Sequence, residues 1–471
     1  MSPIPTASGR FWLYALPQFA IAYVTLAIVN FVPAFYASEV GLPMLTVSAM
    51  MLASRGLDVV TDPLIGNLSD RTRSTHGRRK PWLVAGLPIL IAGAWILFLP
   101  PEGASALYYF SAISVLFLGL TMMQLPYIAW GAELYQDYDI RTRITGIRER
   151  VGALGSAGAL VTALVLGAFG IVSLGSTLEA MAWVLTLGAP LLVAIALHKV
   201  PAEPASVIQS DNGEQLSFWQ GIRVALGNPV FRLFAGGVFL IYLGLAPAGA
   251  TGWFLFDHLL QRSEWYAPSI LLDFTFSFLG LPFWIWLSVR TSKHRALALA
   301  LAWSAGVSLF IPFIVEHGVW ATMAASAVRS FALGGILMLP FAIVADVIDM
   351  DRLKTGQQRT GIYMAFGGIT IKLAITVGVS LALAIPGLFG FDATNRENSA
   401  DALFSVKATY AWLGALFFAL AVPLFWRFPL TRQQVQAMQN MIAERQGSVE
   451  QERDTDRNAA IDDFSGAAET R

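Results

Sequence analysis

Three charged residues interrupt an apolar segment close to the start of the chain. The segment LASRGLDVVTDPLIG, residues 52–66, contains Arg55, Asp58 and Asp62. On a helix, residues three and four positions apart lie on the same face, so these charges would share one face. A carboxylate near the centre of a bilayer costs about 2.5 to 3.5 kcal/mol on insertion scales. We therefore expect the three side chains to face a cavity rather than lipid.

A pair of neighbouring carboxylates suits two kinds of ion chemistry. The oxygen atoms are hard ligands for a small cation, and two close carboxylates can also share one proton because like charges resist double ionisation. Either chemistry would couple an ion to another process. The alternative is a structural Arg–Asp pair between helices, which accounts for Arg55 and one aspartate but leaves the second unexplained.

The composition is that of an integral membrane protein. Of 471 residues 56% are hydrophobic and only 13% are charged, while 31 basic and 31 acidic residues give a formal net charge of zero. Nothing in this balance indicates a nucleic-acid partner. The absence of cysteine excludes disulfides and thiolate chemistry, and the sequence has no nucleotide-binding motif or catalytic group set. We expect no enzyme and no cofactor beyond a coupling ion.

Apolar segments of about 20 residues, enough to cross a bilayer, recur along the chain. They predict an all-α membrane protein with twelve transmembrane helices. The expected spans are 11–37, 43–66, 81–100, 105–130, 149–173, 177–198, 230–257, 266–289, 295–314, 318–346, 361–388 and 404–427.

The arrangement of the spans predicts two six-helix bundles. The polar stretch 199–229 is interpreted as a central cytoplasmic linker between bundles at 1–198 and 230–427. Residues 428–471 are expected to form a polar, partly disordered cytoplasmic tail. A weak internal repeat supports this division, since WLSVRTSKHRALAL of the second half corresponds to the basic loop after span two.

Basic loops predict the orientation in the membrane. Lys and Arg collect in the loops after spans two, four, eight and ten, whereas the alternate loops are short and poor in basic residues. Because basic loops favour the cytoplasmic side, both termini are expected in the cytoplasm of a bacterial-type inner membrane. The N-terminus lacks a short apolar region with a cleavage site, so the first apolar segment is expected to be a span and not a signal peptide.

The loop after span two resembles a motif of the major facilitator superfamily. Its sequence is GNLSDRTRSTHGRR, residues 66–79. The resemblance implies that Gly66 permits close helix approach and that Asp70 pairs with the following arginines. The alternative is an ordinary basic loop on the cytoplasmic side. The joint presence of Gly66, Asp70 and the Arg78–Arg79 pair favours the motif.

Two longer matches resemble the glycoside–pentoside–hexuronide:cation symporter family. They are residues 52–82 and ADVIDMDRLKTGQQRTGIYMA at 345–365, and with the twelve spans the resemblance covers 11–427. It implies a monomeric secondary active transporter that moves a sugar, glycoside or sugar acid together with Na⁺ or H⁺ by alternating access.

The same resemblance assigns the cation site. It implies that Asp58, Asp62 and Thr121 bind the cation, and that Lys372 of span eleven lies close to the two carboxylates. An ammonium group there could replace an absent cation, so that its release would couple ion binding to helix movement. Arg55 is expected to act in this coupling. The residues expected to act in gating are Asp70, Arg71, Arg78, Arg79, Asp346, Asp349, Lys354 and Arg359.

The expected substrate contacts depart from the family's sugar-binding pattern. Sugar permeases of the family have acidic residues where this chain has Ala22 and Gln124, and an aromatic ring where it has Ile128, although Trp130 lies two positions further on. Recognition of galactosides by that arrangement is therefore disfavoured, and the substrate stays open.

Two arginines and a tyrosine complete the substrate candidates. Arg148 lies near the family's arginine of span five, and Tyr127 can supply a hydrogen bond. Arg329 in span ten needs an anionic partner, which is either an anionic substrate or Asp273 of span eight.

Two other functions stay open. One is cation-coupled transport of an amphiphile such as a lysophospholipid, which the apolar residues Ala22 and Ile128 favour and whose headgroup phosphate Arg329 could hold. The other is a non-transporting membrane receptor or scaffold. Such a protein would not need buried carboxylates, so this function is disfavoured.

Overall fold

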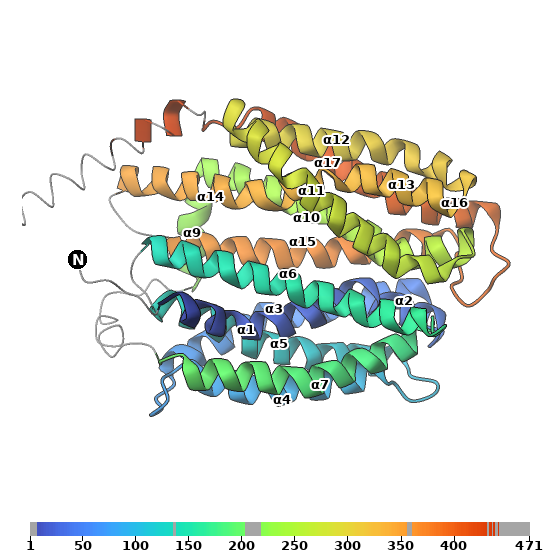
Figure 1. Cartoon of the computed structure of the whole chain (residues 1–471), viewed down its shortest axis with the longest axis horizontal. Coiled ribbons are helices and arrows are strands. Elements are labelled where there is room, and N and C mark those ends of the chain that lie inside the picture. The colour runs from blue at the N-terminus through green and yellow to red at the C-terminus, as the bar shows by residue number, and fades with distance from the viewer. Residues whose placement is uncertain are drawn as a thin grey trace, which may run out of the picture.

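The protein is a bundle of long, roughly parallel helices in the computed structural model (Figure 1). The structure describes residues 7–134, 138–202, 218–355, 360–430, 433–435, 437–438 and 441. Within these residues there are twelve helical stretches long and apolar enough to cross a membrane. The expected all-α fold with twelve spans in two six-helix bundles is confirmed.

The N-terminal half forms one side of the molecule, at the bottom of Figure 1. The structure describes seven helices of this half, which follow one another along the sequence. They are α1 (Ala7–Asn30), α2 (Val32–Ser38), α3 (Met44–Arg71), α4 (Lys80–Phe98), α5 (Ala106–Leu134), α6 (Tyr138–Ala168) and α7 (Leu174–Lys199).

The C-terminal half forms the other side, with α15 next to the N-terminal half (Figure 1). Its main helices are α9 (Phe218–Gly227), α10 (Pro229–Phe254), α11 (Tyr266–Arg290), α12 (Lys293–Ile314), α13 (Val319–Ser330), α14 (Leu333–Thr355), α15 (Thr360–Leu388), α16 (Ala400–Ala408) and α17 (Gly414–Trp426). Short π-helical and 3₁₀ turns lie between them at η2 (Leu255–Leu259), η3 (Ser263–Trp265), η4 (Val315–His317) and η5 (Thr409–Leu413).

The expected linker and tail extend over residues that the structure describes only in part. Helix α7 ends at Lys199 and α10 begins at Pro229, and α9 lies between them. Residues 203–217 of the linker, and most of the tail after residue 430, lie outside the described residues. The boundaries of the four predicted segments stay a prediction.

Four predicted spans are not continuous α-helices, and one of them is the seventh, which enters the π-helical turn η2 after Phe254. The first breaks at Phe31, because Pro33 lies in the first turn of α2 and cannot donate a hydrogen bond to the preceding turn. The tenth breaks at residues 331–332, between α13 and α14, and the twelfth contains the π-helical turn η5. Such irregular turns inside spans are frequent at functional sites.

The two halves meet at the end of the molecule where α2 lies, on the right in Figure 1. The Ser48 hydroxyl of α3 donates to the Ser380 carbonyl of α15 over 2.7 Å, and the Tyr266 hydroxyl of α11 donates to the Asn30 carbonyl over 3.0 Å. Towards the opposite end, a Cβ added to Gly66 would meet no atom within 4 Å. The close helix approach expected at Gly66 is therefore not seen in this structure.

Helices α11 and α13–α14 approach closely at the break in the tenth span. A Cβ added to Gly280 of α11 would lie 2.0 Å from the Phe331 carbonyl oxygen, and one added to Gly334 would lie 2.2 Å from the Ser277 carbonyl oxygen. Backbone atoms cannot move aside as a side chain tip can. The two glycines thus set the spacing of the helices that carry Asp273 and Arg329.

We predict that Gly280→Ala destabilises the protein by roughly 1 to 3 kcal/mol, because the added methyl group overpacks the helix contact. Gly306→Ala in α12 is the matched control, since a Cβ there meets no atom within 4 Å. It should be neutral or stabilising by up to about 1 kcal/mol through helix propensity. Thermal unfolding of the purified variants in one detergent measures both, and equal unfolding temperatures would contradict the prediction.

Candidate cation and substrate site

Asp62 lies at the centre of a polar cluster that joins the two halves. Its Oδ1 atom accepts a hydrogen bond of 2.9 Å from the Thr121 hydroxyl of α5. The Lys372 ammonium of α15 donates to Asp62 Oδ2 over 2.8 Å and to Oδ1 over 3.1 Å. The sequence placed these residues on three different spans, and the structure brings them together near the middle of each helix.

Asp58 extends the cluster by one turn of α3. Its Oδ2 atom lies 2.8 Å from Arg55 Nη1, an i to i+3 contact on the same helix, and 3.4 Å from Lys372 Nζ. The Arg55 guanidinium also lies over the Phe117 ring of α5, with its central carbon 3.4 Å from the ring centroid. Arg55 is thus held by a carboxylate and by a cation–π contact.

The four charges of this cluster cancel. Two carboxylates, Asp58 and Asp62, face two cations, Arg55 and Lys372, and their side chains are between 11% and 26% exposed. Partly buried charges are costly unless they are paired and hydrogen bonded, and the pairing seen here offsets part of that cost. A cation entering between the carboxylates would add a positive charge next to Lys372, and the ammonium would be repelled.

Of the predicted substrate residues of the N-terminal half, some lie on α5 and others lie where α1 contacts α6. Gln124 is half-buried on α5, three residues after Thr121, and Ile128 one turn further is 40% exposed. The Ala22 Cβ lies 3.7 Å from the position that a Cβ on Gly152 would take. Gly152 follows Arg148 by one turn of α6, so Ala22 and Arg148 belong to the same α1–α6 contact. Arg148 pairs with the adjacent Glu149 over 2.8 Å.

Tyr127 and Trp130 lie in helix packing, which does not support the predicted substrate contacts. Both are fully buried. The Tyr127 hydroxyl donates to the Tyr14 carbonyl over 3.0 Å, and the Tyr14 hydroxyl donates to the Tyr127 carbonyl over 2.8 Å. The Trp130 indole donates to the Pro201 carbonyl over 3.1 Å. The reason is steric, because these side chains point from α5 towards α1 and the end of α7.

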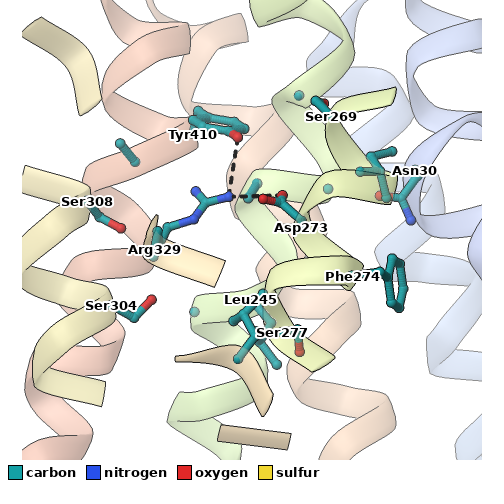
Figure 2. A pocket seen from close by; sticks show the side chains of 18 of the residues that line it. Asn30, Leu245, Ser269, Asp273, Phe274, Ser277, Ser304, Ser308, Arg329 and Tyr410 are labelled. Carbon is teal, nitrogen blue, oxygen red and sulfur yellow. Dashed lines mark hydrogen bonds and ion pairs between the residues drawn. The ribbon is translucent and has the colours of Figure 1, made fainter. Parts of the chain in front are cut away.

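Arg329 faces Asp273 in a cavity of the C-terminal half, as Figure 2 shows. Its Nη2 atom lies 3.5 Å from Asp273 Oδ2 and donates to the Tyr410 hydroxyl over 3.3 Å. Asp273 Oδ1 accepts a hydrogen bond of 2.6 Å from Ser330. Of the two partners that the sequence left open for Arg329, the structure supplies Asp273.

The predicted gating residues of the first half form an ion-pair cluster that also includes Glu133. Arg79 Nη2 lies 2.5 Å from both Asp70 Oδ1 and Glu133 Oε1, and Arg78 Nη2 lies 3.1 Å from Glu133 Oε1. The expected pairing of Asp70 with the loop arginines is therefore present. Arg71 is exposed at the end of α3. Sequence reasoning missed Glu133, although it ends the apolar run of span four just before a basic loop.

The second half has a smaller counterpart of this cluster. Lys293 at the start of α12 lies 2.7 Å from Asp346 Oδ1 of α14. Asp349 is half-buried one turn later, and Lys354 is exposed near the end of that helix. Arg359 lies outside the described residues. Lys293 is a second residue missed by sequence reasoning, although the degenerate repeat placed it in the loop that corresponds to residues 72–79.

Twelve spans in two bundles, with a charged cluster between the bundles, define a membrane transporter of the major facilitator type. The chain belongs to the family described as "MFS/sugar transport protein", whose model matches residues 13–432. The expected superfamily is confirmed, and the protein is an integral membrane transporter of a small molecule and not an enzyme.

Named relatives are distant but match most of the chain. An uncharacterized symporter of Synechocystis is 25% identical over 88% of this chain and 94% of its own length. A putative glycoside/cation symporter of Escherichia coli is 21% identical over 91% of this chain and 93% of its own length. A sodium-dependent lysophosphatidylcholine symporter of Xenopus tropicalis is 22% identical over 85% of this chain and 81% of its own length.

Solved structures agree with the fold. The nucleoside transporter NupG has a TM-score of 0.61 at 14% identity and covers 89% of this chain and all of its own. The xylose transporter XylE of E. coli, in an inward open conformation, has a TM-score of 0.60 at 12% identity. The match covers 91% of this chain and 98% of XylE. At this identity the likeness shows the arrangement of helices alone.

We predict that Glu133→Gln lowers the stability of the protein by about 3 kcal/mol, because it leaves two buried arginines short of a carboxylate. Arg78 and Arg79 are 8% and 5% exposed, so water cannot replace the lost partner well. The control is Glu102→Gln, since Glu102 is exposed in a loop. Thermal unfolding in detergent tests this, and an unchanged Glu133→Gln variant would show that the cluster contributes no stability.

Proposed function

We propose that the protein is a cation-coupled symporter, which moves a small polar solute together with Na⁺ or H⁺ by alternating access. The observation that carries this proposal is the position of Lys372, a residue of the C-terminal half that contacts both carboxylates of the N-terminal half. A single side chain thereby links the occupancy of the acidic pair to the contact between the two halves.

The coupling step is an exchange of cations at Asp58 and Asp62. A bound ion takes carboxylate oxygens from both residues, and the Thr121 oxygen can serve as a further ligand. With the added charge, the Lys372 ammonium is no longer needed for neutrality and leaves the pair. The α3–α15 contact is then free to rearrange, which is how differential binding shifts a two-state equilibrium. Arg55 stays with Asp58 as a fixed counter-charge.

The ion-pair clusters at the ends of the spans act in gating. With the basic loops in the cytoplasm, the Ser48–Ser380 and Tyr266–Asn30 contacts hold the two halves together on the outer side. Opening that side requires the halves to come together at the other end. The Arg79 and Lys293 clusters lie there, so their loops are the candidates for contacts in the outward-facing state.

The substrate proposed is a sugar, glycoside or sugar acid. The description of the family as sugar transport proteins and the printed name of the E. coli relative support it. Gln124 on α5, and Arg148 and Ala22 at the α1–α6 contact, are the residues proposed to face it from the N-terminal half. The proposed setting is a monomer in a bacterial-type inner membrane with both termini in the cytoplasm.

A lysophospholipid is the second candidate substrate. The 40% exposed side chain of Ile128 and the small side chain of Ala22 offer apolar contacts where a sugar site favours polar ones. The printed name of the Xenopus relative describes a sodium-dependent transporter of this kind of lipid. This name also supports Na⁺ as the coupling ion.

We predict that Asp58→Asn and Asp62→Asn abolish substrate accumulation driven by an ion gradient, because each removes a carboxylate from the ion site. The measurement is uptake by proteoliposomes of labelled sugars, uronates and lysophospholipids, driven separately by a Na⁺ and a proton gradient. Glu179→Gln, which changes an exposed carboxylate on α7, should transport like the parent. Unaltered accumulation by both aspartate variants would refute ion coupling at this pair.

A second prediction concerns Lys372. Lys372→Met removes the competing ammonium and leaves the cluster with one negative charge, so Na⁺ should bind on the order of tenfold more tightly, while coupled accumulation is lost. Lys372→Arg keeps the charge and should keep weak binding. Titration of thermal stability with NaCl against choline chloride measures the affinity. A Lys372→Met variant with parental affinity would show that the ammonium does not compete with the ion.

A further inference from the structure

We propose that the cavity around Arg329 is a binding subsite for a neutral, hydroxylated ring of monosaccharide size. This inference rests on the proposed function, since it assumes that the protein carries a small polar solute. It assigns one part of the solute's binding site to a cavity of the C-terminal half, apart from the cation site and in addition to the residues proposed to face the solute from the N-terminal half.

The cavity has a volume of about 230 Å³ and is formed almost entirely by the C-terminal half. Its polar residues come from α11, α12, α13 and η5, as Figure 2 shows. Asn30, at the break between α1 and α2, reaches its edge from the N-terminal half. A solute held here would therefore contact the rim where the two halves meet.

Breaks in the helices position the two largest polar groups. Arg329 lies in the last turn of α13, where a positive charge is favourable at the carboxyl end of a helix. Tyr410 lies in the π-helical turn η5, and its ring centroid is 5.0 Å from the Arg329 guanidinium carbon. Residue 410 lies inside the π-helical turn, and residues 331–332 directly follow Arg329 within two positions. If the chain were regular α-helix at both places, the Arg329 and Tyr410 side chains would have a different orientation relative to each other.

The charge of the cavity favours a neutral solute. Arg329 is 6% exposed and has Asp273 as its counter-charge, so the pair is formally neutral. An anion that took Arg329 would leave the Asp273 carboxylate buried without a cation, which is costly. A neutral ring with several hydroxyl groups avoids this cost, because it can accept from the guanidinium and donate to the carboxylate at once.

Two residues that line the same space carry hydrogen-bonding groups without a protein partner in the described part of the chain. Ser304 is fully buried, lines the cavity, and its hydroxyl has no hydrogen-bond partner among the described residues. A buried hydroxyl without a partner is uncommon in proteins and requires an explanation. Arg329 uses only Nη2 for Asp273 and Tyr410, so in the described part of the chain its Nε and Nη1 donors stay available.

The size and the apolar lining of the cavity agree with one small ring. Its volume lies below the range of about 300 to 1,000 Å³ that is usual for drug-sized ligands. Leu245, Phe274 and Phe418 supply apolar walls around the few polar groups. An acyl chain has no room here beside the polar groups, so the cavity does not suit a whole lysophospholipid.

The test is equilibrium binding to the purified full-length protein in detergent. The probes are radiolabelled neutral pentoses, hexoses and methyl glycosides, together with glucuronate and glycerophosphocholine. We expect a neutral sugar to bind the parent protein at millimolar concentration. Ser304→Ala should weaken that binding about tenfold, because it removes one hydrogen bond, and Asp273→Asn should weaken it further. Ser405→Ala is the matched control, since its buried hydroxyl bonds within α16.

Three results would overturn the proposal. They are no binding of any neutral sugar, equal binding by the parent and Ser304→Ala, and Arg329-dependent binding of glucuronate or glycerophosphocholine in place of a neutral sugar. The Asp62→Asn variant separates this inference from the proposed function. It should fail to accumulate the sugar yet still bind it, and Ser304→Ala should weaken that binding in the Asp62→Asn background too. If Asp62→Asn abolishes accumulation but Ser304→Ala has no effect on sugar binding, the ion coupling is supported and the proposed subsite is refuted.

Discussion

The cost of placing charge in a bilayer is the constraint on which the structure depends. Asp58 and Asp62 can lie at mid-membrane depth only because Arg55 and Lys372 neutralise them. One of these cations is supplied by the same helix and the other by the opposite half of the molecule. Neutrality of the site in the absence of an ion therefore requires α3 and α15 to lie side by side. That requirement makes the contact between the halves sensitive to any ion that replaces the ammonium.

The other charged groups obey the same constraint within each half. Arg329 is matched by Asp273, and the buried arginines directly before α4 are matched by Glu133. These pairs hold helices of one bundle together and do not cross to the other bundle. Each bundle can thus move as a unit without separating a buried charge from its partner, and the cluster around Lys372 is the described exception.

The sequence predicted the parts of this structure that follow from spacing and hydropathy. Residues four apart, such as Asp58 and Asp62, must share a helix face, and the length of apolar runs predicts the spans. It assigned a substrate contact to Trp130, which is buried in helix packing, and it left open whether Arg329 meets Asp273 or a substrate, because both depend on the rotation of one helix against another. The break at residues 331–332 has no proline, although Gly334 and Gly335 follow shortly after it, and the Phe331 carbonyl at the break packs against Gly280 of α11.

The two polar sites differ in how they respond to the membrane. In the proposed mechanism, a cation that enters the site at Asp58 and Asp62 responds to the ion gradient and to the membrane potential, at about 2.3 kcal/mol per charge per 100 mV. The Arg329 cavity is neutral with its own counter-charge, so a neutral solute entering it moves no charge. On the two proposals, energy enters at the first site while the second supplies part of the recognition, and the contact between the halves connects them.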